Sequence, residues 1–338
     1  MINCIYQLVT PGKINLKFEE LSFEKKVIVR PRFMSICHAD QRYYRGKRAL
    51  SVLKKKLPMA LIHECCGTVL KDFSGKFEEG TKVVLIPNIL SKSPQNQIFE
   101  NYQKGSKFRS SGVDGFMQEL VAMDHNRLVE FNDFYNNEHI FSISELISVA
   151  FHAVKRFLGN SHETRKRIAV FGDGNVGFLV SLVISKLIPD SEISVFGHHE
   201  EKLAHFSFVS NTFTDIPENF EFDHAFECTG GQGSTVAIDQ IIDHINPQGT
   251  VILMGVSEDK VHVNTRNILE KGLTFIGCSR SGFDDFVDAI RLLEDEKFNR
   301  TISMLISSLG EVNSINDIHK MFEEVLNVPF KLVFKWNL

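Results

Sequence analysis

The chain has 338 residues, enough for about two domains that each bury a core of their own. Its hydrophobic fraction of 43% and charged fraction of 24% are ordinary for a soluble globular protein, and a net charge of −4 gives no reason to expect a nucleic-acid partner. Residues 1–6 lack the pattern of a signal peptide, and no apolar run approaches the roughly 18 residues that span a bilayer. We therefore expect a cytoplasmic protein without a membrane partner, whose six cysteines are thiols or metal ligands.

The amino-terminal part, up to about residue 140, is predicted to be rich in β-strands. Short runs of β-branched residues at 26–30, 67–70 and 82–86 are separated by turn signals, which is typical of strands. The polar stretch 87–115 predicts a long loop, and loops of that length in compact domains are often functional.

From about Glu145 the predicted strands alternate with helical segments. The strands are expected at 167–171, 192–196, 224–228, 250–254 and 273–277. This alternation predicts a parallel, doubly wound sheet and hence an α/β fold. The tail at 330–335 returns to strand-like alternation, so we expect it to pair back onto the first domain. The expected domains are 1–147 with 279–338, and 148–278 for nucleotide binding.

A glycine-rich turn follows the first strand of the second domain, in the pattern G-x-G-x-x-G. Gly172 allows a tight turn, Gly174 lets a pyrophosphate approach the backbone, and Gly177 lets the following helix pack against the strand. The helix start at Asn175 and Val176 offers free N–H groups to phosphates. The motif alone is a weak signal, and its alternative interpretation is a plain strand-to-helix turn.

The end of the second strand carries information on the cofactor. About 20 residues after the glycines, NAD sites place an acidic residue against the adenosine ribose hydroxyls. This chain has Gly197, His198 and His199 there, with Lys202 one helical turn further on. None of these first residues after the strand is a carboxylate that would repel a 2′-phosphate, which favours NADP(H); alternatively, His198, His199 and Lys202 form a solvated helix start.

A thiolate, an imidazole and carboxylates occur at positions that suit zinc chemistry. Cys37, His63, Glu64 and Glu145 offer the ligand types of a catalytic Zn²⁺ site, which keeps one position open. Asp40 is a candidate to hold the second ring nitrogen of His63. Taken singly, each residue has a structural interpretation, such as a buried small hydrophobe or a core histidine.

Over nearly its full length the chain resembles the zinc-containing medium-chain dehydrogenase/reductase family. The motifs that carry the resemblance are Cys37-x-x-Asp40, Ile62-His63-Glu64, 114–119, 145–149, the glycine turn and Glu227-Cys228-Thr229-Gly230. The resemblance implies a Rossmann domain, a discontinuous GroES-like catalytic domain, a homodimer or homotetramer, and cofactor contacts from Cys228 and Thr229.

The same resemblance implies zinc roles for Cys37, His63, Glu64 and Glu145, and leaves open whether Glu64 or Glu145 is the ligand at a given moment. The loop 87–115 has no cysteine, so only one catalytic zinc per chain is expected. Ala39 and Arg42 stand where related alcohol dehydrogenases relay a proton, so we expect a water held by Glu64 or Glu145 to supply it.

Three arginines and a serine are candidates for binding a substrate phosphate. Arg42 lies close to the predicted zinc ligand Cys37, Arg109 is followed by Ser110 in the polar loop, and Arg280 follows the last predicted strand. Guanidinium groups suit phosphate oxygens, which favours a phosphorylated polyol over a free sugar. The alternative for each arginine is a surface position.

Within that larger family, the chain more specifically resembles the bacterial ribitol-5-phosphate dehydrogenase family. The matching stretches are 33–37, 40–44, 57–59, 108–112, 114–118, 222–228, 263–266 and 269–272. This implies NADPH-dependent reduction of ribulose 5-phosphate, with ribitol 5-phosphate supplying CDP-ribitol for teichoic acid or capsule, and association with a cytidylyltransferase. The alternatives are a zinc dehydrogenase of another polyol or sugar phosphate and a non-catalytic NADPH-binding structural protein.

Overall fold

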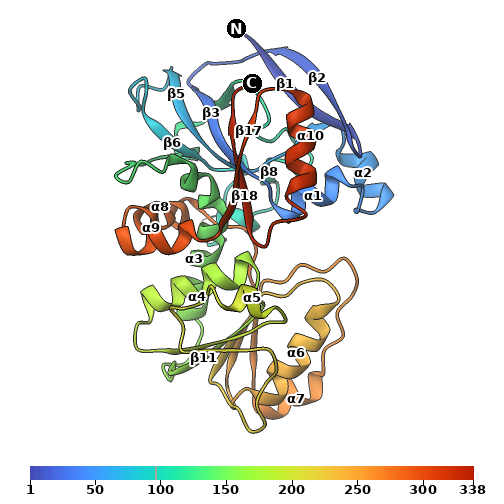
Figure 1. Ribbon diagram of the computed structural model, residues 1–338, viewed down its shortest axis with the longest axis vertical. Helices are drawn as coiled ribbons and strands as arrows, with labels where there is room; N and C mark the ends of the chain where they lie inside the picture. The colour runs from blue at the N-terminus through green and yellow to red at the C-terminus, as the bar shows by residue number, and fades with distance from the viewer. Residues whose placement is uncertain (96) are drawn as a thin grey trace. The chain divides into compact units, whose positions relative to one another are not determined.

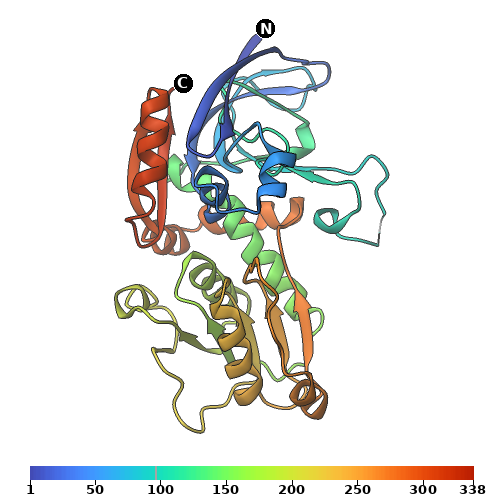
Figure 2. The same cartoon turned by 90° about the vertical axis from the view of Figure 1, so that its right-hand side faces the viewer.

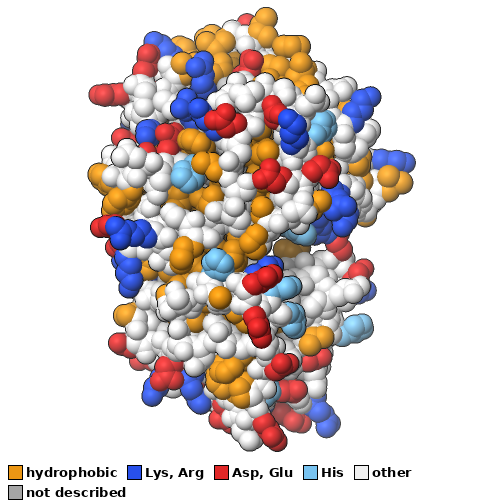
Figure 3. All heavy atoms as spheres, viewed as in Figure 1, with side chains coloured by type: hydrophobic (Ala, Val, Ile, Leu, Met, Phe, Trp, Pro, Cys, Tyr) orange, Lys and Arg blue, Asp and Glu red, His pale blue; other side chains and the backbone are white. Residues whose placement is uncertain are grey.

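The computed structural model describes residues 1–95 and 97–338, which form two compact units. The first unit consists of Met1–Ser148 and Ser281–Leu338, and the second consists of Val149–Arg280. Among the described residues, no helix is long and apolar enough to cross a membrane. On the face drawn in Figure 3, acidic and basic side chains are interspersed, as the small net charge of −4 leads one to expect.

The first unit is built mainly of strands. They are β1 (Ile2–Thr10), β2 (Lys13–Glu20), β3 (Val27–Ser35), β4 (Met59–Ala60), β5 (Glu64–Asp72), β6 (Lys82–Leu85), β7 (Asn88–Ile89), β8 (Lys107–Phe108), β9 (Val121–Met123), β10 (Leu128–Glu130), β17 (Ile306–Val312) and β18 (Lys331–Trp336). Its helices are α1 (His38–Tyr44), α2 (Leu50–Lys56), α8 (Phe283–Leu293), α9 (Glu296–Ser303), α10 (Ile315–Glu324) and the short 3₁₀ helices η1 (Glu100–Tyr102), η2 (His125–Arg127) and η3 (Glu138–Ile143).

The main sheet of this unit pairs the last strands of the chain with strands from its amino-terminal part. Its strand order is β10-β6-β5-β3-β18-β17, with β9 also paired to β3. Strand β18 runs antiparallel to β3, so the predicted return of the tail to the β-rich domain is confirmed. Figure 1 shows β17, β18 and α10 side by side at the red end of the chain, and α10 contacts both strands.

The carboxyl-terminal strand is anchored by its last side chains. The indole N–H of Trp336 donates to the carbonyl oxygen of Gln118 at 2.9 Å. Its ring meets Tyr6 of β1 edge-on, with centroids 5.2 Å apart. Both aromatic residues are buried in one hydrophobic core, so removing the strand would expose apolar surface from both ends of the sequence.

The second unit contains the predicted parallel sheet, which is confirmed. Its strands are β11 (Arg167–Phe171), β12 (Glu192–Phe196), β13 (Asn211–Phe213), β14 (His224–Glu227), β15 (Thr250–Leu253) and β16 (Thr274–Gly277). The helices are α4 (Asn175–Leu187), α5 (Glu200–Leu203), α6 (Gly233–His244) and α7 (Thr265–Lys271), and α3 (Ser144–Leu158) leads into the unit. The strand order is β13-β12-β11-β14-β15-β16, and every pair is parallel.

This strand order places a ligand site at the ends of two central strands. The chain moves outward from β11 to β12 in one direction and from β14 to β15 in the other. Right-handed crossovers therefore put α4 and α6, drawn in yellow-green and gold in Figure 2, on opposite faces of the sheet. In open α/β sheets, ligands bind at the carboxyl ends of the strands where the order reverses, which here are the ends of β11 and β14.

A buried histidine in this sheet predicts a loss of stability in acid. His224 is fully buried; its Nδ1 accepts from the N–H of Thr250, and its Nε2 donates to the carbonyl oxygen of Thr164. Burial, followed by the charge of His162, lowers the pKa of His224 to about 4. The unfolded histidine titrates near pH 6.5, so the unfolded state binds more protons as the pH falls from 6.5 towards 4. We expect this group to cost about 2–3 kcal/mol of folding free energy across that window.

The measurement is urea unfolding at pH 7 and at pH 4.5. His224→Gln keeps a donor near the Nε2 position and has no titrating group, so its unfolding free energy should fall less between the two pH values than that of the wild type. Equal losses in the two proteins would show that His224 does not contribute to the acid transition.

Candidate functional site

The candidate metal centre lies in the first unit, where β3 ends and β5 begins. Ser35, at the end of β3, is paired with Glu64 at the start of β5. This register brings Cys37, which caps the start of α1, close to His63 and Glu64. One ligand atom from each of the three residues lies within 4.8 Å of the other two. Cys37 is partly exposed, while His63 and Glu64 are buried.

Asp40 holds the imidazole of His63 from behind. Its Oδ1 lies 3.2 Å from Nδ1 of His63, and it also accepts from the N–H of Ile62 and from the hydroxyl of Ser110. Its Oδ2 accepts from the N–H of Cys37, which closes the start of α1. Burial alone would lower the pKa of His63, but the Asp40 carboxylate raises it well above its ordinary value. The carboxylate therefore makes His63 more basic and leaves Nε2 for a metal.

A buried lysine that the sequence analysis did not select, Lys331, forms an ion pair with Glu64 of the metal centre. Lys331 starts β18 with its side chain only 3% exposed, and its Nζ lies 2.8 Å from Oε1 and 2.7 Å from Oε2 of Glu64. Nζ also donates to the carbonyl oxygen of Ile36 at 3.3 Å. Burial opposes the charge, yet Glu64, Cys37 and the other neighbouring anions raise the pKa of Lys331 above its ordinary value. Its sequence signal was a lysine at the start of a strand whose next three residues are apolar.

Glu145 lies beside this group rather than inside it. It is buried in the first turn of α3, and its ligand atoms are not within the 4.8 Å group of Cys37, His63 and Glu64. Burial raises the pKa of Glu145 to about 7, with a further raising contribution from the Glu64 carboxylate. A carboxyl group with this pKa suits the holding or passing of a proton near neutral pH.

Two residues predicted to bind the substrate phosphate, Arg109 and Ser110, make hydrogen bonds within the protein. The guanidinium of Arg109 donates to the carbonyl oxygens of Asp114 and Ala122 and packs over the ring of Phe116. Ser110 has a φ of 59° and donates to Asp40, so it supports the metal centre from behind. These contacts assign both residues to the architecture of the loop, and their contact with substrate stays a prediction.

Arg42 lies in a strongly cationic part of α1 and the loop that follows. Burial, and then the charges of Arg42, Lys47 and Arg48, lower the pKa of His38, the residue directly after Cys37. Burial and the charge of Arg48 also lower the pKa of Arg42. The guanidinium of Arg48 lies 4.9 Å from the ring centroid of Tyr43, which orients it. Arg42, Lys47 and Arg48 form a group of cations that fits an anionic ligand, and Arg48 was missed in the sequence analysis.

The glycine turn in the second unit has the backbone geometry that its motif predicts. Gly172 has a φ of 127°, and a Cβ on Gly177 would lie 1.9 Å from the carbonyl oxygen of Gly172, so only glycine fits there. The turn borders a cavity of about 440 Å³. The cavity is lined by residues 171–174, 196–198, 214–216, Cys228, Thr229, Gly233, Val236, Ala237 and Gln240.

Five of the predicted cofactor residues are not among the residues that line this cavity. They are Asn175, Val176, His199, Lys202 and Gly177, and the last of these packs the helix on the turn instead. Arg280, a predicted phosphate contact, is the last residue of the second unit and has a φ of 57°. Their contacts with cofactor or substrate stay predictions.

Comparison with known proteins places the chain in a family. Residues 24–133 match the model of the alcohol dehydrogenase GroES-like domain, and residues 195–295 match that of the zinc-binding dehydrogenases. The chain is 48% identical to the ribulose-5-phosphate reductase of Streptococcus pneumoniae, across 100% of this chain and 98% of that protein. The chain belongs to the zinc-containing medium-chain dehydrogenases, in the branch of the ribulose-5-phosphate reductases.

Two further comparisons agree with this placement. The chain is 47% identical to ribulose-5-phosphate reductase 1 of Staphylococcus aureus, with 99% of each protein covered. The crystal structure of S. aureus TarJ in complex with NADPH matches with a TM-score of 0.88 and 42% identity, across 100% of both chains. The predicted family and the predicted combination of a GroES-like domain with a Rossmann sheet are therefore confirmed.

The metal of the zinc-binding dehydrogenases fits the residues of this chain. A thiolate, an imidazole and a carboxylate are ligands that Zn²⁺ binds, and three protein ligands leave the fourth position of a catalytic site open. Cys37, His63 and Glu64 supply this set with their ligand atoms already gathered, and Asp40 supplies the carboxylate that orients the histidine.

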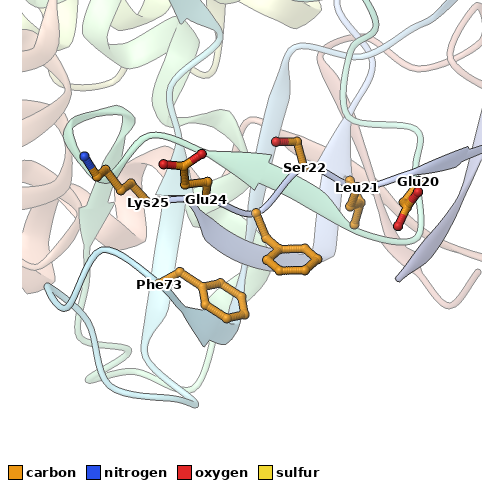
Figure 4. A pocket seen from close by; sticks show the side chains of 7 residues that line it. Glu20, Leu21, Ser22, Glu24, Lys25 and Phe73 are labelled. Carbon is orange, nitrogen blue, oxygen red and sulfur yellow. The ribbon is translucent and has the colours of Figure 1, made fainter.

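A second hollow, of about 710 Å³, lies on the first unit of this medium-chain dehydrogenase. Figure 4 shows Leu21, Glu24, Lys25 and Phe73 around it, and the rings of Phe23 and Phe73 stack with centroids 5.0 Å apart. None of the predicted site residues lines this hollow. It is therefore no part of the candidate metal or cofactor site.

Proposed function

We propose that the protein catalyses the reversible, NADPH-dependent reduction of D-ribulose 5-phosphate to D-ribitol 5-phosphate at a zinc centre. The observation that carries this proposal is the gathered set of Cys37, His63 and Glu64 in a chain that aligns end to end with ribulose-5-phosphate reductases. Four such reductases are 44–48% identical to it over 98–100% of their lengths.

Each residue near the centre has a definite task in this reaction. Zinc would act as a Lewis acid towards the substrate carbonyl, and the nicotinamide would supply the hydride. Asp40 fixes the tautomer of His63, and Lys331 balances the charge that Glu64 and the Cys37 thiolate bring into a buried site. A water held by Glu64 or Glu145 delivers the proton that the product hydroxyl requires.

The substrate phosphate binds to the cationic surface of α1. Arg42 lies five residues after Cys37, and Lys47 and Arg48 belong to the same positive field. Guanidinium groups form charge-assisted hydrogen bonds with phosphate oxygens, which are stronger than neutral ones. This arrangement favours a phosphorylated pentose over the free sugar.

The test is a rate assay that follows the absorbance of reduced nicotinamide. Ribulose 5-phosphate with NADPH should give the highest kcat/KM, above ribulose, xylulose 5-phosphate and the same reaction with NADH. A higher kcat/KM for another sugar phosphate would assign the chain to a related dehydrogenase. Cofactor binding without turnover of any of these sugars, in zinc-loaded protein, would support a non-catalytic role instead.

The wider setting follows from this activity. The enzyme works in the cytoplasm as a homodimer or homotetramer, and its product supplies CDP-ribitol for teichoic acid or capsule synthesis. A cytidylyltransferase is the enzyme class that would consume ribitol 5-phosphate, and it is the proposed protein partner. Sedimentation of the purified chain, alone and mixed with that cytidylyltransferase, tests both assemblies.

Replacing Arg42 with alanine should impair reduction of the phosphorylated substrate selectively. A charge-assisted hydrogen bond contributes about 1.5–3 kcal/mol, so kcat/KM for ribulose 5-phosphate should fall roughly 10- to 150-fold. The rate with unphosphorylated ribulose should change little. Arg45→Ala is the matched control, because Arg45 follows the same helix with an exposed side chain. Equal losses on both substrates would mean that Arg42 shapes the site and does not bind phosphate.

A further inference from the structure

Asp173, a residue of the glycine turn, places a carboxylate in the lining of the cofactor cavity. Asp173 is the second residue of that turn, and its Oδ2 accepts hydrogen bonds from the backbone N–H groups of His198 and His199 at 2.8 and 2.9 Å. Nδ1 of His199 lies 2.8 Å from the same oxygen. Although burial opposes ionisation, these hydrogen bonds hold the pKa of Asp173 below its ordinary value. The side chain is therefore an anion at neutral pH.

This carboxylate stands where a side chain on Gly197 would begin. An ideal Cβ on Gly197 would lie 2.5 Å from Cβ of Asp173 and 2.9 Å from its carboxyl carbon. In NAD sites, an acidic residue at the end of the second strand accepts hydrogen bonds from the ribose hydroxyls. Asp173 therefore brings a carboxylate to the strand end at which residues 197–199 supply none.

Asp173 also has a carboxylate oxygen available to a ligand. Its three contacts all involve Oδ2, and Oδ1 accepts no hydrogen bond from the described residues. Asp173 lines the cavity of about 440 Å³ together with Gly172, Gly174, Gly197 and His198. This part of the cavity, between the glycine turn and the end of β12, is where the adenosine ribose of a dinucleotide is read.

We propose that Asp173 is a specificity-determining residue that narrows the preference for NADPH over NADH. This inference rests on the cofactor site of the proposed function. Oδ1 accepts a hydrogen bond from the ribose 2′-hydroxyl of NADH, whereas the same carboxylate repels the 2′-phosphate of NADPH. Oδ2 meanwhile holds the 197–199 turn in place, so one side chain both shapes the subsite and limits its discrimination.

Asp173→Asn separates charge from shape, because the amide oxygen still accepts from the two backbone N–H groups. We expect this variant to bind NADPH about 5- to 20-fold more tightly and NADH about 3- to 10-fold more weakly than the wild type. Gly197→Asp is a poorer test, because its Cβ would collide with Asp173.

The experiment measures cofactor affinity without any sugar substrate. Dissociation constants for NADPH and NADH are taken from nicotinamide fluorescence, and those for adenosine 2′,5′-bisphosphate and AMP from calorimetry. Asp190→Asn is the matched control, because Asp190 is an exposed carboxylate residue of the same unit that does not line the cavity. Thermal unfolding of each protein without cofactor reports whether the turn is intact.

The fragments should follow the same order as the whole cofactors in Asp173→Asn, while Asp190→Asn changes the ratio less than two-fold. An unchanged NADPH-to-NADH ratio in Asp173→Asn, or weaker NADPH binding, would overturn the proposal, as would equal shifts in both variants. A wild type that binds neither fragment would also overturn it. If the ratio shifts as expected but ribulose 5-phosphate is not reduced, the proposed reaction fails and the role of Asp173 stands.

Discussion

Replacing Cys37 with serine should remove nearly all reductase activity while leaving cofactor binding intact. The thiolate is one of the three gathered ligands in the first unit, whereas the glycine turn and its cavity lie entirely in the second. Lewis-acid stabilisation at a metal contributes several kcal/mol, so kcat should fall at least about 10³-fold. The unchanged dissociation constant for NADPH would show that the second unit remains folded.

Metal analysis gives the same prediction a readout that does not depend on turnover. The wild type should hold one zinc per chain, because the loop at 87–115 contains no cysteine for a second site. Cys37→Ser should hold far less, and Cys65→Ala, a change at a buried cysteine outside the ligand group, should hold as much as the wild type. Near-normal turnover in Cys37→Ser, or two tightly bound zincs in the wild type, would contradict the assigned centre.

The parts of the fold that could be predicted from sequence are those with a strong local period. The runs at 167–171 and 192–196 became β11 and β12, because short, mostly apolar runs that contain β-branched and aromatic residues are typical of buried parallel strands. Strand β13 was missed, since its three residues, Asn211–Phe213, are mostly exposed at the edge of the sheet and leave no apolar pattern.

The site was harder to predict, because its support comes from residues far apart in the sequence. Cys37, His63 and Glu64 were found by residue type and resemblance, and the register of β3 with β5 explains their meeting. Asp173 accepts hydrogen bonds from residues that lie 25 and 26 positions further along the sequence, and no local sequence pattern predicts these contacts. Residue type alone does not decide a contact: Arg109 has the chemistry of a phosphate ligand and its guanidinium donates to two backbone carbonyls, so its contact with substrate stays a prediction.

Replacing Lys331 with methionine should destabilise the first unit and make its stability depend more strongly on zinc. The variant leaves the Glu64 carboxylate, which is fully buried, without its ion-pair partner. Breaking a buried ion pair by removing one partner costs about 3–5 kcal/mol, because the remaining charge is uncompensated. Zinc bound at Glu64 supplies positive charge, so the deficit should be smaller in zinc-loaded protein than after chelation.

The measurement is the free energy of unfolding in urea, with and without zinc. Lys335→Met is the matched control, since Lys335 lies on the same strand and is only partly buried. Because the pKa of Lys331 is raised, its stabilisation is fully present below the unfolded lysine value of about 10.4 and is lost only as the pH rises through the higher folded value. The difference in unfolding free energy between the wild type and Lys331→Met should therefore be the same at pH 7 and pH 9.

Lys331→Arg keeps the charge and should recover part of the lost unfolding free energy. A zinc-free Lys331→Met protein as stable as the wild type would mean that Glu64 needs no buried cation.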